Sequence, residues 1–128
     1  MEVRESVLVT APAERVWSLI ADAEERARWW PWLDLDATPG GRMEERWEGT
    51  RTTGDVLEAD PPSLLRLTWR DDGWPATTEV ELRLEPEGDG TRVTVRHTGW
   101  DALPDARTLV AAHGAGWRAH LDDLASLS

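Results

Sequence analysis

Four residues of this chain carry side chains that could transfer protons inside a covered cavity. Glu45, Glu58 and His97 fall at alternating positions that are expected to face the covered side of a sheet, and His113 lies opposite them on a predicted helix. A histidine and a glutamate in an apolar cavity have pKa values moved toward neutrality, so such a pair can act as general acid and base. One hypothesis is therefore an enzyme that uses His97 with Glu45 or Glu58.

The same positions allow other interpretations. A buried carboxylate is costly unless it is paired or hydrated, so Glu45 and Glu58 imply a wet cavity, a buried arginine partner, or a different strand register. His97, His113 and Glu58 are residue types that bind zinc, but their spacing matches no ligand motif. The chain has no Cys, and its serines form no readable Ser-His-acid arrangement. The sequence predicts neither a metal nor another cofactor.

Composition limits the classes of partner. A chain of 128 residues is expected to form one domain, 1–128. The formal net charge of −11 argues against nucleic acid and against anionic membrane surfaces. The sequence shows no basic-then-apolar leader and no apolar run near the length of a membrane span, which predicts a soluble, cytoplasmic protein. All 14 basic residues are Arg and all 9 aromatic residues are Trp, a bias typical of high-GC bacterial genomes.

The first third of the chain predicts one strand and two short helices. Residues 2–10 alternate in polarity and form the expected strand. Thr10 is a possible cap for a helix over 13–20, with Pro12 in its first turn. Asp22 is a possible cap for a second helix over 24–30, which Pro31 ends.

The middle of the chain predicts a run of antiparallel strands. Polarity alternates between turn signals such as Pro39-Gly40-Gly41 and Glu87-Gly88-Asp89-Gly90. The expected strands are 42–48, 52–59, 64–70, 78–85 and 91–98. Half-buried alternation in one strand after another indicates a sheet with one face in water and the other covered.

The last segment, 103–128, predicts a long helix that covers this sheet. Pro104 and Asp105 suit its first turn. Its apolar face is expected to contain Leu109 or Val110, His113, Trp117, Leu121 and Leu124. Gly114 and Gly116 each cost roughly 1 kcal/mol relative to Ala, so they indicate either close backbone packing or space kept free beside Trp117. The predicted fold class is α+β, with about six antiparallel strands around the C-terminal helix.

Five segments resemble one family together: VLVTAPAERVWSLIAD, ARWWPW, GDVLEADPPSLLRLTWR, GDGTRVTVRHTGW and GWRAHLDDL. They are similar to the SRPBCC (START-like, helix-grip) superfamily, in the branch that resembles the C-terminal domain of the heat-shock-protein-90 ATPase activator. The resemblance implies a curved sheet wrapped around the long helix, with a cavity between them that often holds an apolar small molecule. Related cyclases use such a cavity to fold a polyketide chain.

The resemblance and the alternation together nominate residues for the cavity wall, although most of these residue types would also be needed for a plain core. The candidates are Trp30, Met43, Glu45, Trp47, Glu58, Leu67, Trp69, Val80, Leu82, Val95, His97, His113, Trp117 and Leu121. A further group of tryptophans could stack a flat ligand or anchor a protein. It consists of Trp29, Trp30, Trp32, Trp74 and Trp100. Among these, Trp74 and Trp100 are expected to be partly exposed because they lie next to loop signals.

Three functions remain open at this point. The first is a binding module for a small apolar molecule of aromatic or polyketide-like type, acting as a monomer or weak homodimer. The second is an aromatase/cyclase-type enzyme with the His97 pair described above. The third is a co-chaperone-like interaction protein, which the acidic charge and the lack of the activator's additional domain disfavour.

Overall fold

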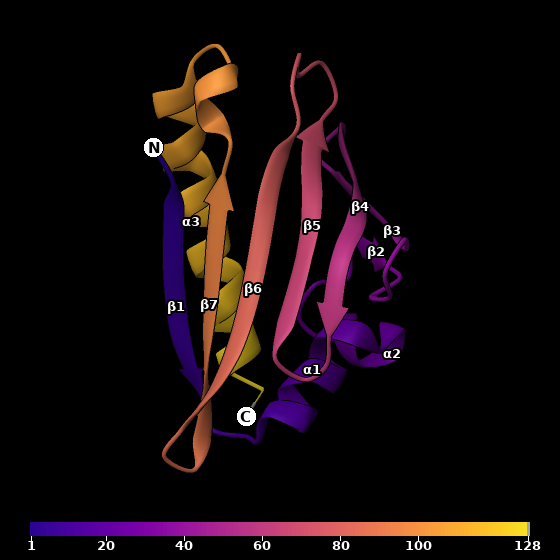
Figure 1. The fold of residues 1–128 in the computed structure, drawn as a ribbon, viewed down its shortest axis with the longest axis vertical. Helices are drawn as coiled ribbons and strands as arrows, with labels where there is room; N and C mark the ends of the chain where they lie inside the picture. Colours follow the sequence, from indigo (N-terminus) through magenta and orange to yellow (C-terminus); the bar gives the residue numbers. More distant parts are fainter. Residues whose placement is uncertain (128) are drawn as a thin grey trace.

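A seven-stranded antiparallel sheet organises residues 1–127, the part of the chain that the computed structural model describes (Figure 1). The strand order is β1-β7-β6-β5-β4-β3-β2. The strands are β1 (Val3–Val9), β2 (Leu33–Leu35), β3 (Arg42–Trp47), β4 (Thr50–Asp60), β5 (Leu64–Asp71), β6 (Thr78–Glu87) and β7 (Gly90–Thr98). Every pairing between neighbours is antiparallel, including that of β1 with β7, and the other pairings join strands that are consecutive in the chain.

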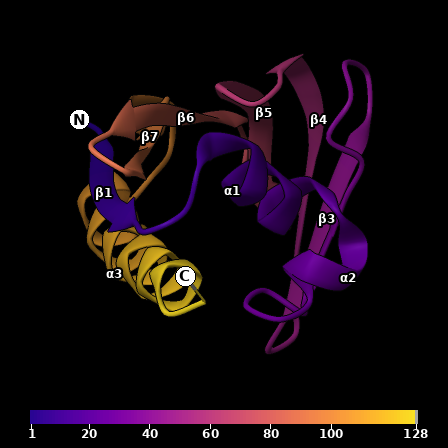
Figure 2. The same ribbon diagram turned by 90° about the horizontal axis from the view of Figure 1, so that it is seen from below.

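The helices cover one face of this sheet. They are α1 (Ala13–Ala21), α2 (Ala23–Arg26), the short 3-10 helix η1 (Trp100–Ala102) and α3 (Ala106–Ala125). Figure 2 shows α1, α2 and α3 on the same, concave side of the curved sheet. The predicted α+β helix-grip class is therefore confirmed. None of the helices in residues 1–127 combines the length and the apolar character needed to cross a membrane.

Strand alternation places the core as predicted. On β5, Leu65, Leu67 and Trp69 are buried on the concave face, and on β6 Val80 and Leu82 continue the same layer. Such period-two burial follows from the pleat, which turns successive side chains to opposite faces. The core therefore lies between the inner faces of the strands and the three helices.

Several predicted element boundaries were wrong. Helix α1 has Pro12 at its N-cap and no side-chain cap, so Thr10 does not cap it. Asp22 does cap α2, by accepting a 3.0 Å hydrogen bond from the Glu25 amide, but that helix ends at Arg26 instead of residue 30. Helix α3 begins only after Asp105, whose φ of 59° is left-handed and outside the helix. The three-residue strand β2 was not predicted.

A buried arginine fixes the segment that carries the first tryptophans. Arg26 is 4% exposed, and its guanidinium donates hydrogen bonds to the carbonyls of Leu33 (3.2 Å) and Ile20 (2.9 Å). Trp29 Nε1 donates to the Leu19 carbonyl at 2.7 Å. These bonds join α1, α2 and β2, because buried carbonyls need a donor. They hold Trp29 and its neighbour Trp30 in place.

Helix α3 packs along one edge of the sheet and leaves the other half open. Its main strand partner is β1, and a Cβ on Gly114 would come within 3.9 Å of Val3 Cγ1. Arg118 on its outer side forms an ion pair with Glu5 of β1, with Nε and Oε1 3.0 Å apart. A Cβ at Gly114 would therefore make only an ordinary van der Waals contact with β1, and the expected close backbone packing at this glycine is not observed. The inner surface of β3, β4 and β5 is left facing α3 across a gap lined by side chains.

Candidate functional site

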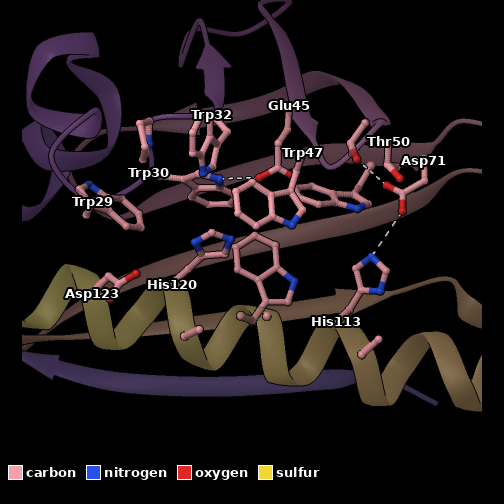
Figure 3. Close-up of a pocket in the computed structure, with 17 residues that line it drawn as sticks. Trp29, Trp30, Trp32, Glu45, Trp47, Thr50, Asp71, His113, His120 and Asp123 are labelled. Atoms are coloured by element: carbon pink, nitrogen blue, oxygen red, sulfur yellow. Dashed lines mark hydrogen bonds and ion pairs between the residues drawn. The ribbon is translucent and has the colours of Figure 1, made fainter.

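A groove of about 550 Å³ lies between α3 and the inner faces of β3, β4 and β5; it is called the α3 groove below (Figure 3). Its lining combines tryptophans with carboxylates, imidazoles and hydroxyls. The lining residues are Trp29, Trp30, Pro31, Trp32, Glu45, Trp47, Thr50, Thr52, Trp69, Asp71, Ala112, His113, Gly116, Trp117, Ala119, His120 and Asp123. The volume falls in the range of pockets that bind small molecules.

Trp30 is the centre of the aromatic wall. Its ring meets that of Trp117 edge-on, with centroids 5.4 Å apart, and the His120 imidazole stacks on it at 3.9 Å. Trp32 and Trp47 form a second pair at 5.3 Å, and they are 53% and 49% exposed. The groove thus has a buried aromatic floor and an exposed aromatic rim.

Three neighbouring strands place a row of polar side chains on the same face. Glu45 of β3 is paired with Thr52 of β4, and Thr52 is paired with Asp71 of β5. The Thr52 hydroxyl donates to Asp71 Oδ1 at 2.5 Å, and Trp30 Nε1 donates to Glu45 Oε2 at 2.6 Å. Across the groove, His113 Nε2 of α3 is 3.8 Å from Asp71 Oδ2. Figure 3 shows Glu45 and Asp71 on the side of the groove opposite His113 and His120 of α3.

Burial shifts the pKa values of two groove residues. Burial raises the pKa of Glu45, the Trp30 hydrogen bond opposes that shift, and the nearby Asp71 carboxylate adds to it. Burial lowers the pKa of His120, against which the Asp123 carboxylate acts more weakly. His113 donates from Nδ1 to the Leu109 carbonyl at 2.9 Å, so its Nε2 is the nitrogen that faces the groove.

His97 is enclosed in the core and lines no part of the groove. Its side chain is 0% exposed, Trp117 Nε1 donates to its Nδ1 at 3.1 Å, and its Nε2 is 2.7 Å from Thr78 Oγ1. The Thr78 hydroxyl donates to the Trp69 carbonyl, so it accepts from His97 Nε2. Burial, with a smaller effect of His113, lowers the pKa of His97 to about 3. A neutral imidazole with both nitrogens bonded has no proton to exchange with a ligand.

Glu58 lies on the opposite face of the sheet, which corrects the prediction that it lines the cavity. The register of β4 against β5 shifts between Val56 and Glu58, so that Val56 pairs with Leu67 but Glu58 pairs with Arg66. The extra residue, Leu57, forms a bulge that turns the following side chains over. Arg66 then binds Glu58 at 3.0 Å on the outer surface.

The remaining predicted residues divide into three groups. Trp30, Glu45, Trp47, Trp69, His113 and Trp117 line the α3 groove. Met43, Leu67, Val80 and Leu82 line a separate interior void of about 20 Å³, while Val95 and Leu121 lie in the solid core. Contact of any of these residues with a ligand stays a prediction. Trp69 Nε1 is buried without a hydrogen-bond partner among the described residues.

Sequence reasoning missed several groove residues and misplaced one tryptophan. Asp71, His120 and Asp123 were not nominated, although Asp71 follows Trp69 by two on the same strand face and His120 follows Trp117 by three on the same helix. Gly116, predicted to leave space beside Trp117, does line the groove. Trp100 was expected to be partly exposed but is fully buried, because its ring packs against His97 and His113 with centroids 4.2 and 4.9 Å apart. Its Nε1 donates to the His97 carbonyl at 2.9 Å. No group of three potential metal ligands occurs within residues 1–127.

Comparison with known proteins agrees with this geometry. CalU16 from Micromonospora echinospora is 32% identical over 96% of this chain and 71% of its own, with a TM-score of 0.75. DynU16, from the dynemicin biosynthetic locus, is 26% identical with a TM-score of 0.84; it aligns with 98% of this chain, which spans only 46% of DynU16. The Aha1 dimer from Colwellia psychrerythraea, at 18% identity and a TM-score of 0.79, aligns over 97% of this chain and 92% of its own and shows the fold alone. No curated protein matches the chain.

The family assignment follows from the sequence and the fold together. Residues 10–128 match the family described as Activator of Hsp90 ATPase homolog 1-like protein, which covers all elements from α1 onward. The curved sheet and the long C-terminal helix are the helix-grip arrangement that the sequence motifs predicted. The chain therefore belongs to the Activator of Hsp90 ATPase homolog 1-like family, within the SRPBCC superfamily.

Proposed function

We propose that this protein is a binding module for a small, largely apolar aromatic molecule, which it holds in the α3 groove. The observation that carries the proposal is the gathering of six tryptophans on one groove: Trp29, Trp30, Trp32, Trp47, Trp69 and Trp117. Aromatic rings offer large rigid surfaces that favour stacking with a flat ligand. The sequence bias toward Trp explains how many there are, but it does not explain why six of nine line one groove.

The exposed rim supports the same proposal. Trp32 and Trp47 lie against each other, and about half of each side chain is in contact with water. Covering apolar surface is favourable by roughly 25 cal/mol per Å². A ligand that extends from Trp30 on the buried floor to this rim would therefore gain binding free energy by covering both surfaces. Exposed apolar patches of this kind often mark binding sites.

Binding without turnover is favoured over the aromatase/cyclase alternative. That alternative needs His97 and a glutamate to reach one substrate, but His97 is sealed in the core and Glu58 faces the outer surface. Any proton transfer in the groove would depend on Glu45, Asp71, His113 or His120, and of these the alternative used only Glu45. Similarity to DynU16, a protein of the dynemicin biosynthetic locus, supports a ligand that belongs to a biosynthetic pathway.

Tryptophan fluorescence with a neutral probe, 2-(hydroxymethyl)naphthalene, tests the proposal. Gly116→Leu places a side chain in the groove at a position where a Cβ meets nothing within 4 Å, so the helix tolerates it. We expect this variant to weaken binding by about tenfold or more. The matched control is Ala115→Leu, an exposed residue of the same helix outside the groove, which should bind as the wild type does. Equal binding by both variants would contradict the proposal.

The co-chaperone-like function stays a prediction. Family membership keeps it open, and the adjacent Trp32 and Trp47 offer exposed apolar surface that a protein partner could contact. A pull-down from the native lysate with wild type and with Trp47→Ala would detect such a partner. The predicted monomer or weak homodimer can be checked by light scattering in the same buffer.

A further inference from the structure

The charges around the α3 groove have one sign. Three carboxylates line it, from Glu45, Asp71 and Asp123, and no arginine does so within the described residues 1–127. The chain contains no Lys, so arginine is its only permanent side-chain cation. All the positive charge that the groove itself can offer comes from His113 and His120, and burial favours the neutral form of His120. The groove is therefore an acidic site with aromatic walls.

Within the described residues, several carboxylates elsewhere on the sheet are paired with arginines, whereas Glu45 in the groove is not. Glu44, the neighbour of Glu45 on the outer face, binds both Arg46 (2.7 Å) and Arg51 (3.1 Å). Arg66 similarly joins Glu58 and Glu79. Glu45 is more enclosed by the protein than Glu44, yet it has no guanidinium partner among the described residues and is bonded only by Trp30 Nε1. A half-buried carboxylate without a cation is the costlier arrangement, so the groove lacks a positive charge that its surroundings would favour.

The strand register sets the distance between the two carboxylates that would bind such a positive charge. Glu45 and Asp71 lie two strands apart with Thr52 between them, and neighbouring strands are about 4.8 Å apart. Two carboxylates in such a row can face one cation between them from either side. Trp47 follows Glu45 by two residues and Trp69 precedes Asp71 by two, so a tryptophan accompanies each carboxylate on the same strand face. Indole faces attract cations through their ring quadrupole, and Trp does so best among aromatic residues.

We propose that the natural ligand of the α3 groove is an organic cation: an aromatic or polycyclic molecule with a protonated or quaternary nitrogen bound between Glu45 and Asp71. This inference rests on the proposed function, since it names the chemical class of the ligand that the groove holds. The tryptophans contact the ring system, and the two carboxylates neutralise the nitrogen. His113, whose Nε2 is 3.8 Å from Asp71 Oδ2, is the groove side chain that already lies beside that carboxylate.

Three probes that share one ring system test the inference. At pH 7, 2-(aminomethyl)naphthalene is a cation, 2-(hydroxymethyl)naphthalene is neutral, and 2-naphthoate is an anion. Isothermal titration calorimetry on the wild type should rank their affinities in that order, with the amine at least about tenfold tighter than the alcohol. The preference for the amine should shrink with added salt, because part of it is electrostatic.

Two isosteric variants identify the carboxylates responsible. In Glu45→Gln we expect the affinity for the amine to fall about fivefold or more while the affinity for the alcohol is unchanged. Glu44→Gln is the matched control: it removes the same charge one residue away but on the outer face, and it should leave both affinities within about twofold. Asp71→Asn provides a second variant, with the same expected loss, in case Glu45→Gln does not fold. Circular dichroism checks folding in each case.

The outcomes separate this inference from the proposed function. If the alcohol binds but the amine is no tighter, the groove binds neutral aromatics and the cation inference is overturned. If Glu44→Gln weakens amine binding as much as Glu45→Gln, the preference comes from the overall net charge, and the assignment to the groove fails. If none of the three probes binds the wild type, the proposed function itself fails.

Discussion

Trp117 Nε1 donates a 3.1 Å hydrogen bond to Nδ1 of His97, and this contact fixes the protonation state of a buried histidine. An indole nitrogen can only donate, so Nδ1 must be the unprotonated nitrogen and Nε2 must carry the hydrogen. The Nε2 hydrogen then points to Thr78 Oγ1 at 2.7 Å. The bond joins helix α3 to strand β7 and shows that His97 has a structural role, holding the helix against the sheet.

His97 should stay neutral through the physiological pH range. Its pKa in the folded protein, lowered to about 3, is far below the 6.5 of an unperturbed histidine. NMR of the imidazole carbon-bound protons should therefore show no titration of His97 between about pH 8 and pH 5, whereas the same residue in denaturant titrates near pH 6.5. A midpoint above about pH 5.5 in the folded protein would contradict this assignment.

The same shift predicts how stability depends on pH. The unfolded chain binds a proton at His97 near pH 6.5 and the folded chain only near pH 3, so His97 makes the fold less stable as the pH falls between these values. The slope attributable to His97 is at most about 1.4 kcal/mol per pH unit. His97→Gln, whose amide can also accept and donate, should flatten the acid side of the stability curve measured by urea unfolding.

Trp47→Ala should affect binding more than stability. About half of the Trp47 side chain is already exposed, so its removal should lower the free energy of unfolding by only about 1 kcal/mol. Affinity for the naphthalene probes should fall by about tenfold, because Trp47 and Trp32 form the rim. Leu57→Ala, similarly exposed at 47% but outside the groove, is the control and should leave affinity unchanged.

Glu58→Gln should have almost no effect on ligand binding. The carboxylate lies on the outer face and pairs with Arg66, an exposed contact that contributes less than about 1 kcal/mol to stability. Affinity for all three naphthalene probes should stay within about twofold of the wild type. A loss as large as that of Glu45→Gln would mean that the β4 bulge does not form in solution.

Arg26→Leu should destabilise the protein strongly. The substitution keeps much of the apolar stem but leaves the buried carbonyls of Ile20 and Leu33 without their donor. We expect the free energy of unfolding in urea to fall by about 2–4 kcal/mol. Arg28→Leu, two residues away and exposed with only an ion pair to Glu25, should change it by less than about 1 kcal/mol.

The predictable part of the fold is the part governed by regular periodicity. Alternation in strands β5, β6 and β7 and the three-to-four spacing of Trp117, Leu121 and Leu124 gave the correct elements and buried faces. The family motifs added the arrangement of helix and sheet. Strand β2 could not be predicted because three residues are too few to show a period. It is held by a hydrogen bond from the Arg26 side chain to the Leu33 carbonyl.

The site was less predictable because it depends on how elements pack against one another. Alternation cannot reveal the extra residue in β4, and that single residue turns Glu58 away from the groove. Nor can it show that α3 lies over β1 instead of over the sheet centre, which puts Val95 and His97 under the helix and leaves Trp47 and Asp71 open. Of the predicted carboxylates, Glu45 lines the groove because no irregularity precedes it on β3.

The position of α3 over β1 also has an evolutionary consequence. The helix and the strands beneath it, β1 and β7, maintain the folded state, whereas most of the sheet side of the groove comes from one contiguous stretch, 45–71. Within that stretch, exposed groove positions such as Trp47 and Thr50 can change and alter ligand preference, while buried residues such as Leu65 and Leu67 remain part of the core. Selection for a new ligand and selection for folding then act largely on different side chains of the sheet. Such a division permits one scaffold to diverge rapidly in ligand specificity while its architecture is retained.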